Sequence, residues 1–331
     1  NLHLGNCNVN LRFEHGIISP AYKVYKLVEC NPMFMQAWVK KERTKDFFLK
    51  ASTEGASVCR KNIVWEELYK QELPVPRIEE QTKVGDYFSN LDHLINLHQC
   101  KCDETKKLKK YMLQKMFPQN GKKIPEIRFE GFTDEWEQRK LGEVCDFING
   151  DRSSNYPNDT DFYDSGIPFV GSDSLGDTFV NRNKLRFISC EKYEQMRGLK
   201  IQNKDILYTL RGAGFGKCSI SDFFDGTVAS SLVGIRCNEE ELEPYFFVQW
   251  LNSTNAENEK KKAVNGSTAQ NISVEDMKKY MIYLPLQEEQ QKIGAYFCNL
   301  DYLITLHQRK SSCTPILRKT HQNYKGGNSN A

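Results

Sequence analysis

The sequence predicts an α+β fold in which two related globular units, the first one partial, are joined by two long helices. Two observations predict this fold. A segment of 21 residues, 79–99, returns at 288–308 with 15 identical positions, which is far beyond chance for segments of this length. Each copy carries a helical pattern, whereas the chain between the copies contains short β-rich runs bounded by glycine, asparagine and aspartate.

Composition excludes several classes of protein. The chain has 331 residues, enough for two domains of ordinary size. It has no apolar run of membrane length and no signal-peptide pattern at its start. Its eleven cysteines are scattered singly, which favours a reducing cytoplasm over a disulfide scaffold, and no set of four ligands has zinc-site spacing. The net charge of +3 is too small to identify or to exclude a nucleic-acid binder.

The internal repeat extends upstream of the two helical segments. Residues Gly16–Ser19 align with Gly226–Ala229, and Pro32, Phe34 and Trp38 align with Pro244, Phe246 and Trp250. The first unit therefore retains only its distal part. The predicted domains are 1–73, a partial first unit; 74–118, a central helix; 119–135, a linker; 136–283, a second unit; 284–312, a distal helix; and 313–331, a disordered tail.

Both repeated segments begin as helices are expected to begin, with prolines followed by acidic residues. Apolar residues and one histidine then alternate at spacings of four and three, which predicts a coiled-coil seam. The obvious partner of each copy is the other copy. The predicted helix-pairing residues are Val84, Phe88, Leu91, Ile95 and His98 in the first copy, and Ile293, Phe297, Leu300, Ile304 and His307 in the second. The two histidines are interpreted as polar residues that set the register, because no carboxylate or cysteine lies near them with the spacing of a metal site or a catalytic triad.

Three motifs resemble parts of enzymes, but none is complete. Gly212–Cys218 resembles a phosphate-binding loop that is one residue short and ends in cysteine instead of serine or threonine. Asn31–Phe34 resembles a methyltransferase signature, yet its repeat equivalent Glu243–Phe246 indicates a helix start. Glu259-Lys260-Lys261 resembles the end of a nuclease motif without an aspartate partner. No catalytic residue and no metal ligand is therefore predicted.

Three loops of the second unit suit contacts with DNA. Each combines cations or amides with small residues, which reach phosphates and base edges. A surface loop without function is the alternative for each one taken alone. The candidate DNA-binding residues are Arg152, Ser153, Asn155 and Tyr156 in the first loop, Arg211, Gly212, Gly214 and Lys217 in the second, and Lys260, Lys261, Lys262, Asn265, Ser267 and Thr268 in the third.

Several segments of the sequence together resemble the specificity subunit of type I restriction–modification systems. The resemblance rests on Trp136–Val144, which opens a target recognition domain, on Gly16–Tyr22 in the remnant of a first one, and on Leu210-Arg211-Gly212 and Asn265–Thr268. It also rests on the two helices with Leu-Pro, Glu-Glu-Gln and Leu-His-Gln, and on Leu113–Pro118 at the end of the central helix. It covers the chain from Gly16 to about Gln308.

The resemblance implies two target recognition domains, each reading one half of a split DNA sequence, with two antiparallel coiled-coil helices between them. It also implies docking of two modification subunits, which carry S-adenosylmethionine and methylate adenine, and of restriction subunits, which use ATP and magnesium. The specificity subunit itself has no catalytic residues and no cofactor. The chain departs from the family pattern in the partial first domain and after Gln308, where Cys313-Thr314-Pro315 interrupts the heptads.

Two alternatives of other classes remain open from the residues alone. One is a non-catalytic coiled-coil scaffold or regulator whose globular units bind protein rather than DNA. The other is an autonomous nuclease or methyltransferase, which lacks a cofactor loop or metal cluster in the sequence.

Overall fold

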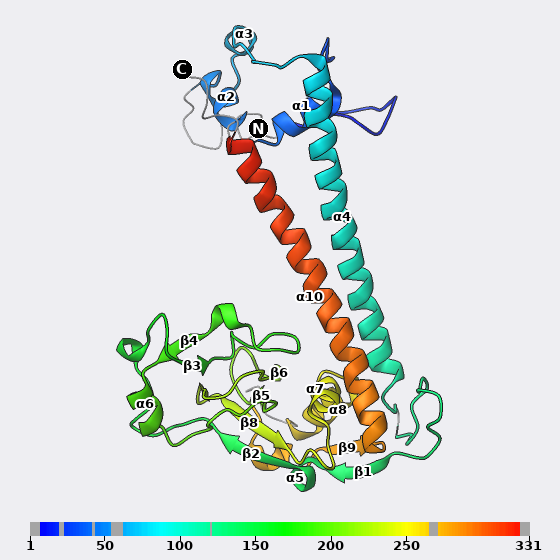
Figure 1. Ribbon diagram of the computed structural model, residues 1–331, viewed down its shortest axis with the longest axis vertical. Helices are drawn as coiled ribbons and strands as arrows, with labels where there is room; N and C mark the ends of the chain where they lie inside the picture. The colour runs from blue at the N-terminus through cyan, green and yellow to red at the C-terminus, as the bar shows by residue number, and fades with distance from the viewer. Residues whose placement is uncertain are drawn as a thin grey trace. The chain divides into compact units, whose positions relative to one another are not determined.

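The chain was analysed as a computed structural model, which describes residues 7–19, 23–41, 44–53, 62–119, 121–264 and 271–324, with side chains to residue 312. Mixed helices and strands confirm the α+β class (Figure 1). The chain divides into two compact units: unit 1 comprises residues 1–102 and 305–331, and unit 2 comprises residues 103–304. Residues 20–22, 265–270 and 325–331, which carry parts of the predicted motifs and tail, lie outside the described residues.

Unit 1 contains helices α1 (Pro32–Val39), α2 (Thr44–Lys50) and α3 (Trp65–Tyr69), the first part of α4 (Ile78–Lys115) and the last part of α10 (Gln287–Tyr324). The side chain of Asn31 accepts hydrogen bonds from the backbone N–H groups of Met33 and Phe34, and Pro32 occupies the first helical turn. This arrangement caps a helix. The structure thereby confirms that Asn31–Phe34 is a helix start.

The strands of unit 2, as far as the structure describes them, form three sheets. Antiparallel strands build a four-stranded sheet in the order β2-β8-β5-β6, a second sheet pairs β1 with β9, and a third has the order β4-β3-β7 with β3 and β7 parallel. The strands are β1 (Glu137–Lys140), β2 (Cys145–Asn149), β3 (Ile167–Val170), β4 (Arg186–Ile188), β5 (Ile206–Thr209), β6 (Cys218–Ile220), β7 (Thr227–Val228), β8 (Leu232–Cys237) and β9 (Met281–Leu284). The helices are α5 (Leu141–Val144), η2 (Asp159–Asp161), η3 (Arg182–Lys184), α6 (Cys190–Gln195), α7 (Pro244–Leu251), α8 (Thr254–Ala263) and α9 (Val274–Met277).

The core of unit 2 is centred on large aromatic side chains. The rings of Phe117, Trp136 and Phe246 contact one another, with centroids 5.4–6.2 Å apart, and Phe297 of α10 stacks on Phe117. Each of these four side chains is at most 1% exposed. Three predicted helix-pairing residues, Ile293, Phe297 and Leu300, belong to this same core cluster. In unit 2 the apolar stripe of α10 therefore packs into the globular core as well as toward the end of α4.

The repeat is visible in matching hydrogen bonds within the two units. In unit 1 the side chain of Gln81 accepts from Asn31 N (2.9 Å) and donates to Pro76 O (2.8 Å). In unit 2 its equivalent Gln290 accepts from Glu243 N (2.9 Å) and donates to Pro285 O (3.0 Å). Each buried glutamine thus ties the start of a long helix to the start of a short one.

A glycine allows the close approach of these helices in each unit. A Cβ added to Gly85 would lie 2.7 Å from Phe34 N, and one added to its equivalent Gly294 would lie 2.9 Å from Phe246 N. Neither distance is compatible with a side chain, because the contacted atoms are backbone. The glycines of the repeated segment are therefore explained by packing.

The two long helices have the same length, 38 residues. Helix α4 ends at Lys115, close to the predicted end at residue 118. Helix α10 ends at Tyr324 and so passes the predicted boundary at residue 312, through Pro315. A proline removes one backbone donor and does not end a helix whose other hydrogen bonds persist. No helix in the described ranges, these two included, has an apolar stretch that would suit a membrane span.

The two repeat histidines contact each other in unit 1. The Nδ1 atoms of His98 and His307 are 3.1 Å apart and the ring centroids 5.3 Å apart. One ring must donate and the other accept, so at least one Nδ1 atom carries no proton.

We expect acid to weaken this histidine contact. Partial desolvation, followed by the charges of Lys310, His307 and Lys101, lowers the pKa of His98 below its ordinary value of 6.5. Because the folded state then binds fewer protons than the unfolded state, its stability falls as the pH drops below about 6.5. Thermal unfolding between pH 7.5 and 5 should show this loss, and His98→Asn should reduce the slope. An unchanged slope in the variant would contradict the assignment.

Candidate nucleic-acid interface

The second predicted loop, Leu210–Lys217, is here called the glycine loop. It joins β5 to β6 as a hairpin, closed by hydrogen bonds from Thr209 N to Lys217 O (2.9 Å) and from Gly216 N to Thr209 O (3.0 Å). Gly212 and Gly216 have φ values of +86° and +83°, which other residues rarely adopt. The phosphate-binding loop that this segment resembles leads into a helix N-terminus, whereas the glycine loop leads into strand β6. The glycine loop therefore lacks the geometry of that motif.

Three other segments of unit 2 meet the glycine loop. A Cβ added to Gly214 would lie 2.9 Å from the Cβ atom of Ser172, and one added to Gly216 would lie 2.7 Å from Nζ of Lys260 in α8. On the third side, Arg211 forms a β-bridge with Asn271, the last residue of the third predicted loop and its first described residue after 264. The glycine loop is thus the centre at which separate parts of the sequence converge.

The first predicted loop is held by a buried carboxylate. Asp151 is 4% exposed and accepts hydrogen bonds from Ser153 N (2.7 Å) and Arg197 N (2.8 Å). Burial raises the pKa of Asp151, but these backbone donors outweigh burial and the net pKa is lowered. The carboxylate is therefore ionised at neutral pH and fixes the backbone that carries the next residue, Arg152.

Arg152 and Arg211 are both exposed. Partial burial and the charge of Arg211 together lower the pKa of Arg152. Among the ion pairs formed by described residues, neither arginine has a carboxylate partner. Two exposed guanidinium groups whose charges interact attract an anion, and each can form two parallel hydrogen bonds with phosphate or guanine.

The other candidates of the first loop are used within the protein. The Asn155 side chain donates to Gln195 O (3.0 Å), and the hydroxyl of Ser153 accepts from Asn155 N (3.2 Å). The ring of Tyr156 is half-buried against Phe169, with centroids 5.9 Å apart. These contacts shape the loop, which leaves Arg152 and Ser154 exposed to solvent.

The lysines of α8 differ among themselves. Lys260 pairs with Glu257 and lies over the ring of Phe215, 5.5 Å from its centroid. Lys262 pairs with Glu259 at 2.5 Å, whereas Lys261 is exposed without an ion pair to any described residue. Lys260 supports the glycine loop, and Lys261 is the lysine most available to an anion. Asn265, Ser267 and Thr268 lie outside the described residues.

Sequence reasoning missed Ser172, which carries no sequence signal, because only the fold brings it to the glycine loop. Asp151 and Asn271 belong to the first and third predicted loops, but the sequence did not predict that Asp151 holds the first loop or that Asn271 bridges to Arg211. Among the described residues, no three His, Cys, Asp or Glu side chains are grouped so as to hold a metal ion.

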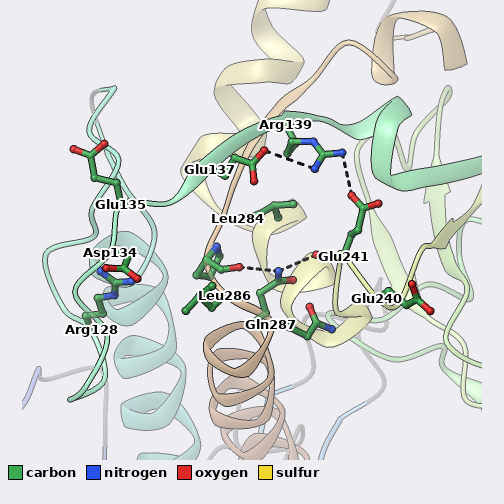
Figure 2. Close-up of a pocket in the computed structure, with 12 residues that line it drawn as sticks. Arg128, Asp134, Glu135, Glu137, Arg139, Glu240, Glu241, Leu284, Leu286 and Gln287 are labelled. Atoms are coloured by element: carbon green, nitrogen blue, oxygen red, sulfur yellow. Dashed lines mark hydrogen bonds and ion pairs between the residues drawn. The ribbon is translucent and has the colours of Figure 1, made fainter.

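A pocket of about 290 Å³ lies elsewhere in unit 2, where β1, β9 and the start of α10 meet (Figure 2). Five carboxylates and two arginines are among its lining residues, and Figure 2 shows Arg139 between Glu137 and Glu241. This excess of negative charge repels phosphate. The pocket is therefore distinct from the surface that carries Arg152 and Arg211, and only that surface suits DNA. The residues that line the pocket are Arg128, Asp134, Glu135, Glu137, Arg139, Glu240, Glu241, Leu284, Pro285, Leu286, Gln287 and Gln290.

A known protein family matches the part of the chain that carries Arg152 and Arg211. Residues 133–312, more than half of the chain, match the family described as type I restriction modification DNA specificity domain. The chain belongs to this family. The matched residues contain the glycine loop, the Arg152 loop, helix α8 and the start of α10.

Two curated relatives come from Methanocaldococcus jannaschii. The type I restriction enzyme MjaVIII specificity subunit is 24% identical over 277 residues, which cover 81% of this chain and 64% of the relative. The putative type I restriction enzyme MjaX specificity subunit is 25% identical over 262 residues, or 77% and 58%. The specificity-domain chain thus spans about three fifths of the length of these relatives.

Solved structures show the same fold. The S subunit of a type I restriction-modification system from M. genitalium matches with a TM-score of 0.61 and 14% identity, over 89% of this chain and 72% of that one. A structure describing complex assembly and conformational transition of the type I R-M system matches with a TM-score of 0.53 and 20% identity, over 88% and 69%.

Proposed function

We propose that this chain reads DNA as a specificity subunit of a type I restriction–modification complex. The observation that carries the proposal is the exposed Arg152–Arg211 pair, held beside a glycine hairpin in the part of the chain that matches the specificity-domain family. The glycines let the backbone approach the duplex, and the guanidinium groups reach phosphates or guanine edges. Lys261 adds a contact to the DNA backbone that does not depend on sequence.

The site read by the complex is bipartite in this proposal. Each long helix has 38 residues and is therefore about 57 Å long at a rise of about 1.5 Å per residue. One turn of duplex DNA is about 34–36 Å, so a recognition unit at each end of such a helix pair addresses separated half-sites. Unit 2 is the reader of one half-site.

The chemistry belongs to partner subunits in this proposal. Two modification subunits bind S-adenosylmethionine and methylate adenine, and restriction subunits use ATP and magnesium. This chain contributes no catalytic residue and no cofactor site. The helices α4 and α10 provide the docking surface for the modification subunits, and the complex acts in the cytoplasm.

The test is to map methylated adenines across the genome of cells with and without the gene. We expect one split sequence motif to lose its methylation in the deletion strain and to regain it when the gene is returned. The chain should also co-purify with a methyltransferase subunit. Loss of no motif, with the chain bound to another protein, would instead support a coiled-coil scaffold or regulator.

A further inference from the structure

Two buried cysteines of unit 2 face each other across neighbouring strands. Strand β2 forms an edge of the four-stranded sheet and pairs antiparallel with β8. The register places Cys145, the first residue of β2, opposite Cys237, the last residue of β8. Both belong to the main core cluster and are 8% and 9% exposed.

The backbone hydrogen bonds between β2 and β8 show whether Cys145 and Cys237 form a hydrogen-bonded or a non-hydrogen-bonded pair. Asn238 N donates to Val144 O at 2.9 Å, and farther along the same register Gly150 N donates to Leu232 O at 3.2 Å. Bonded and non-bonded pairs alternate along an antiparallel ladder. Cys145 and Cys237, one step from the first of these bonded pairs, therefore form a non-bonded pair, in which the side chains are closest.

Such a pair has the geometry that a disulfide needs. Cα atoms of a non-bonded pair are about 4.5 Å apart, which lies within the range of about 4.4–6.8 Å spanned by disulfides. Residues directly opposite in an antiparallel pair project their side chains from the same face of the sheet, and both thiols lie in the core cluster. In agreement with this placement, the neighbouring Cys145 thiol, followed by burial, raises the pKa of Cys237.

We propose that Cys145 and Cys237 are a redox modification site. The two thiols form a cross-strand disulfide when they react with a disulfide oxidant such as oxidised glutathione. One cysteine, as thiolate, attacks the oxidant and releases one reduced glutathione. The second cysteine then attacks the mixed disulfide and releases another. Two protein thiols become one disulfide, and one oxidised glutathione becomes two reduced molecules.

A disulfide between Cys145 and Cys237 would stabilise this edge of the sheet. The pair lies at the start of β2, an edge strand whose neighbour in the sheet is β8, so fraying of this edge admits the oxidant. Beyond β2 the chain continues through Asp151 to Arg152. A disulfide would fasten the edge strand that leads into the Arg152 loop and would restrict the unfolded chain over a long loop, so that the oxidised form resists unfolding. This inference does not depend on the proposed function.

The test treats the purified full chain with oxidised glutathione over a series of ratios to reduced glutathione. We expect non-reducing mass spectrometry to find a peptide containing Cys145 joined to one containing Cys237, lighter by two hydrogen atoms. The thermal unfolding midpoint of unit 2 should rise, and a reductant should reverse both changes. Cys145→Ser and Cys237→Ser should each abolish them, whereas Cys190→Ser, which removes an exposed single cysteine, should abolish neither.

The same oxidation is repeated in urea at a concentration below the unfolding transition. A negative result then cannot be explained by poor access of glutathione to the buried thiols. If Cys190 gains glutathione there while Cys145 and Cys237 remain thiols, the proposal is wrong. Stable glutathione adducts on Cys237, or bonds between Cys145 and other cysteines, would overturn it equally, because the register predicts one specific partner.

Discussion

Replacing Arg152 and Arg211 with alanine should weaken DNA binding by at least about 1–3 kcal/mol, the usual effect of removing an arginine that contacts a base. Both guanidinium groups are exposed, their charges interact, and neither has a carboxylate partner among the described residues. DNA binding would satisfy both charges at once. Fluorescence anisotropy with the assembled complex, on a duplex carrying the methylated motif and on a random duplex, measures the loss.

A matched variant removes two positive charges elsewhere in unit 2. Arg182→Ala with Lys184→Ala takes both charges from the exposed 3-10 helix η3, so it lowers the net charge by the same amount. We expect this control to retain most of the affinity and the preference for the motif. Equal losses in the two variants would show that charge alone is responsible. An unchanged affinity in Arg152→Ala with Arg211→Ala would remove the glycine loop from the interface.

Glu289→Ala should destabilise unit 2 by about 3–5 kcal/mol, the cost of breaking a buried ion pair by removing one partner. The Glu289 side chain has no exposed surface, and its two oxygens accept from Nε and Nη2 of Arg128 at 2.7 and 2.8 Å. Arg128 is only 11% exposed. Without the carboxylate, a buried guanidinium remains uncompensated at the start of α10.

Urea unfolding can be followed through Trp136 and Trp250 in a background with Trp38→Phe and Trp65→Phe, because the first two tryptophans lie in the core of unit 2. Glu288→Ala is the control, since its exposed neighbouring carboxylate should change stability by no more than about 0.5 kcal/mol. A loss for Glu289→Ala as small as that of the control would mean that water replaces the carboxylate at low cost.

Local sequence signals predicted where individual elements begin. Glu243–Phe246 was predicted to be a helix start, and α7 begins there at Pro244. Such signals succeed because a cap or a proline acts within a few residues of itself. The end of α10 was predicted less well, because the helix continues through Pro315 to Tyr324.

Longer-range contacts were predictable only where the repeat supplied them. The identity of His98 and His307 in two helical copies suggested a shared seam, and the two rings do contact each other. The buried cluster in which Lys109 and Thr178 bind Asp301 (2.6 Å each), with Gln249 donating to the same carboxylate at 3.0 Å, had no such signal. Its members come from four segments with no common pattern.

The sequence by itself determined the α+β class, the repeat, the two long helices and the family resemblance. These features depend on hydrophobic periodicity and on short motifs that each lie within one segment of the chain. Only the tertiary structure decided which candidates form one surface. It placed Arg211 against Asn271, turned Lys260 toward Phe215, used Asn155 and Tyr156 for packing, and paired Cys145 with Cys237. Sheet order and strand register bring together residues far apart in the chain, and those depend on the burial of the whole core rather than on any local pattern.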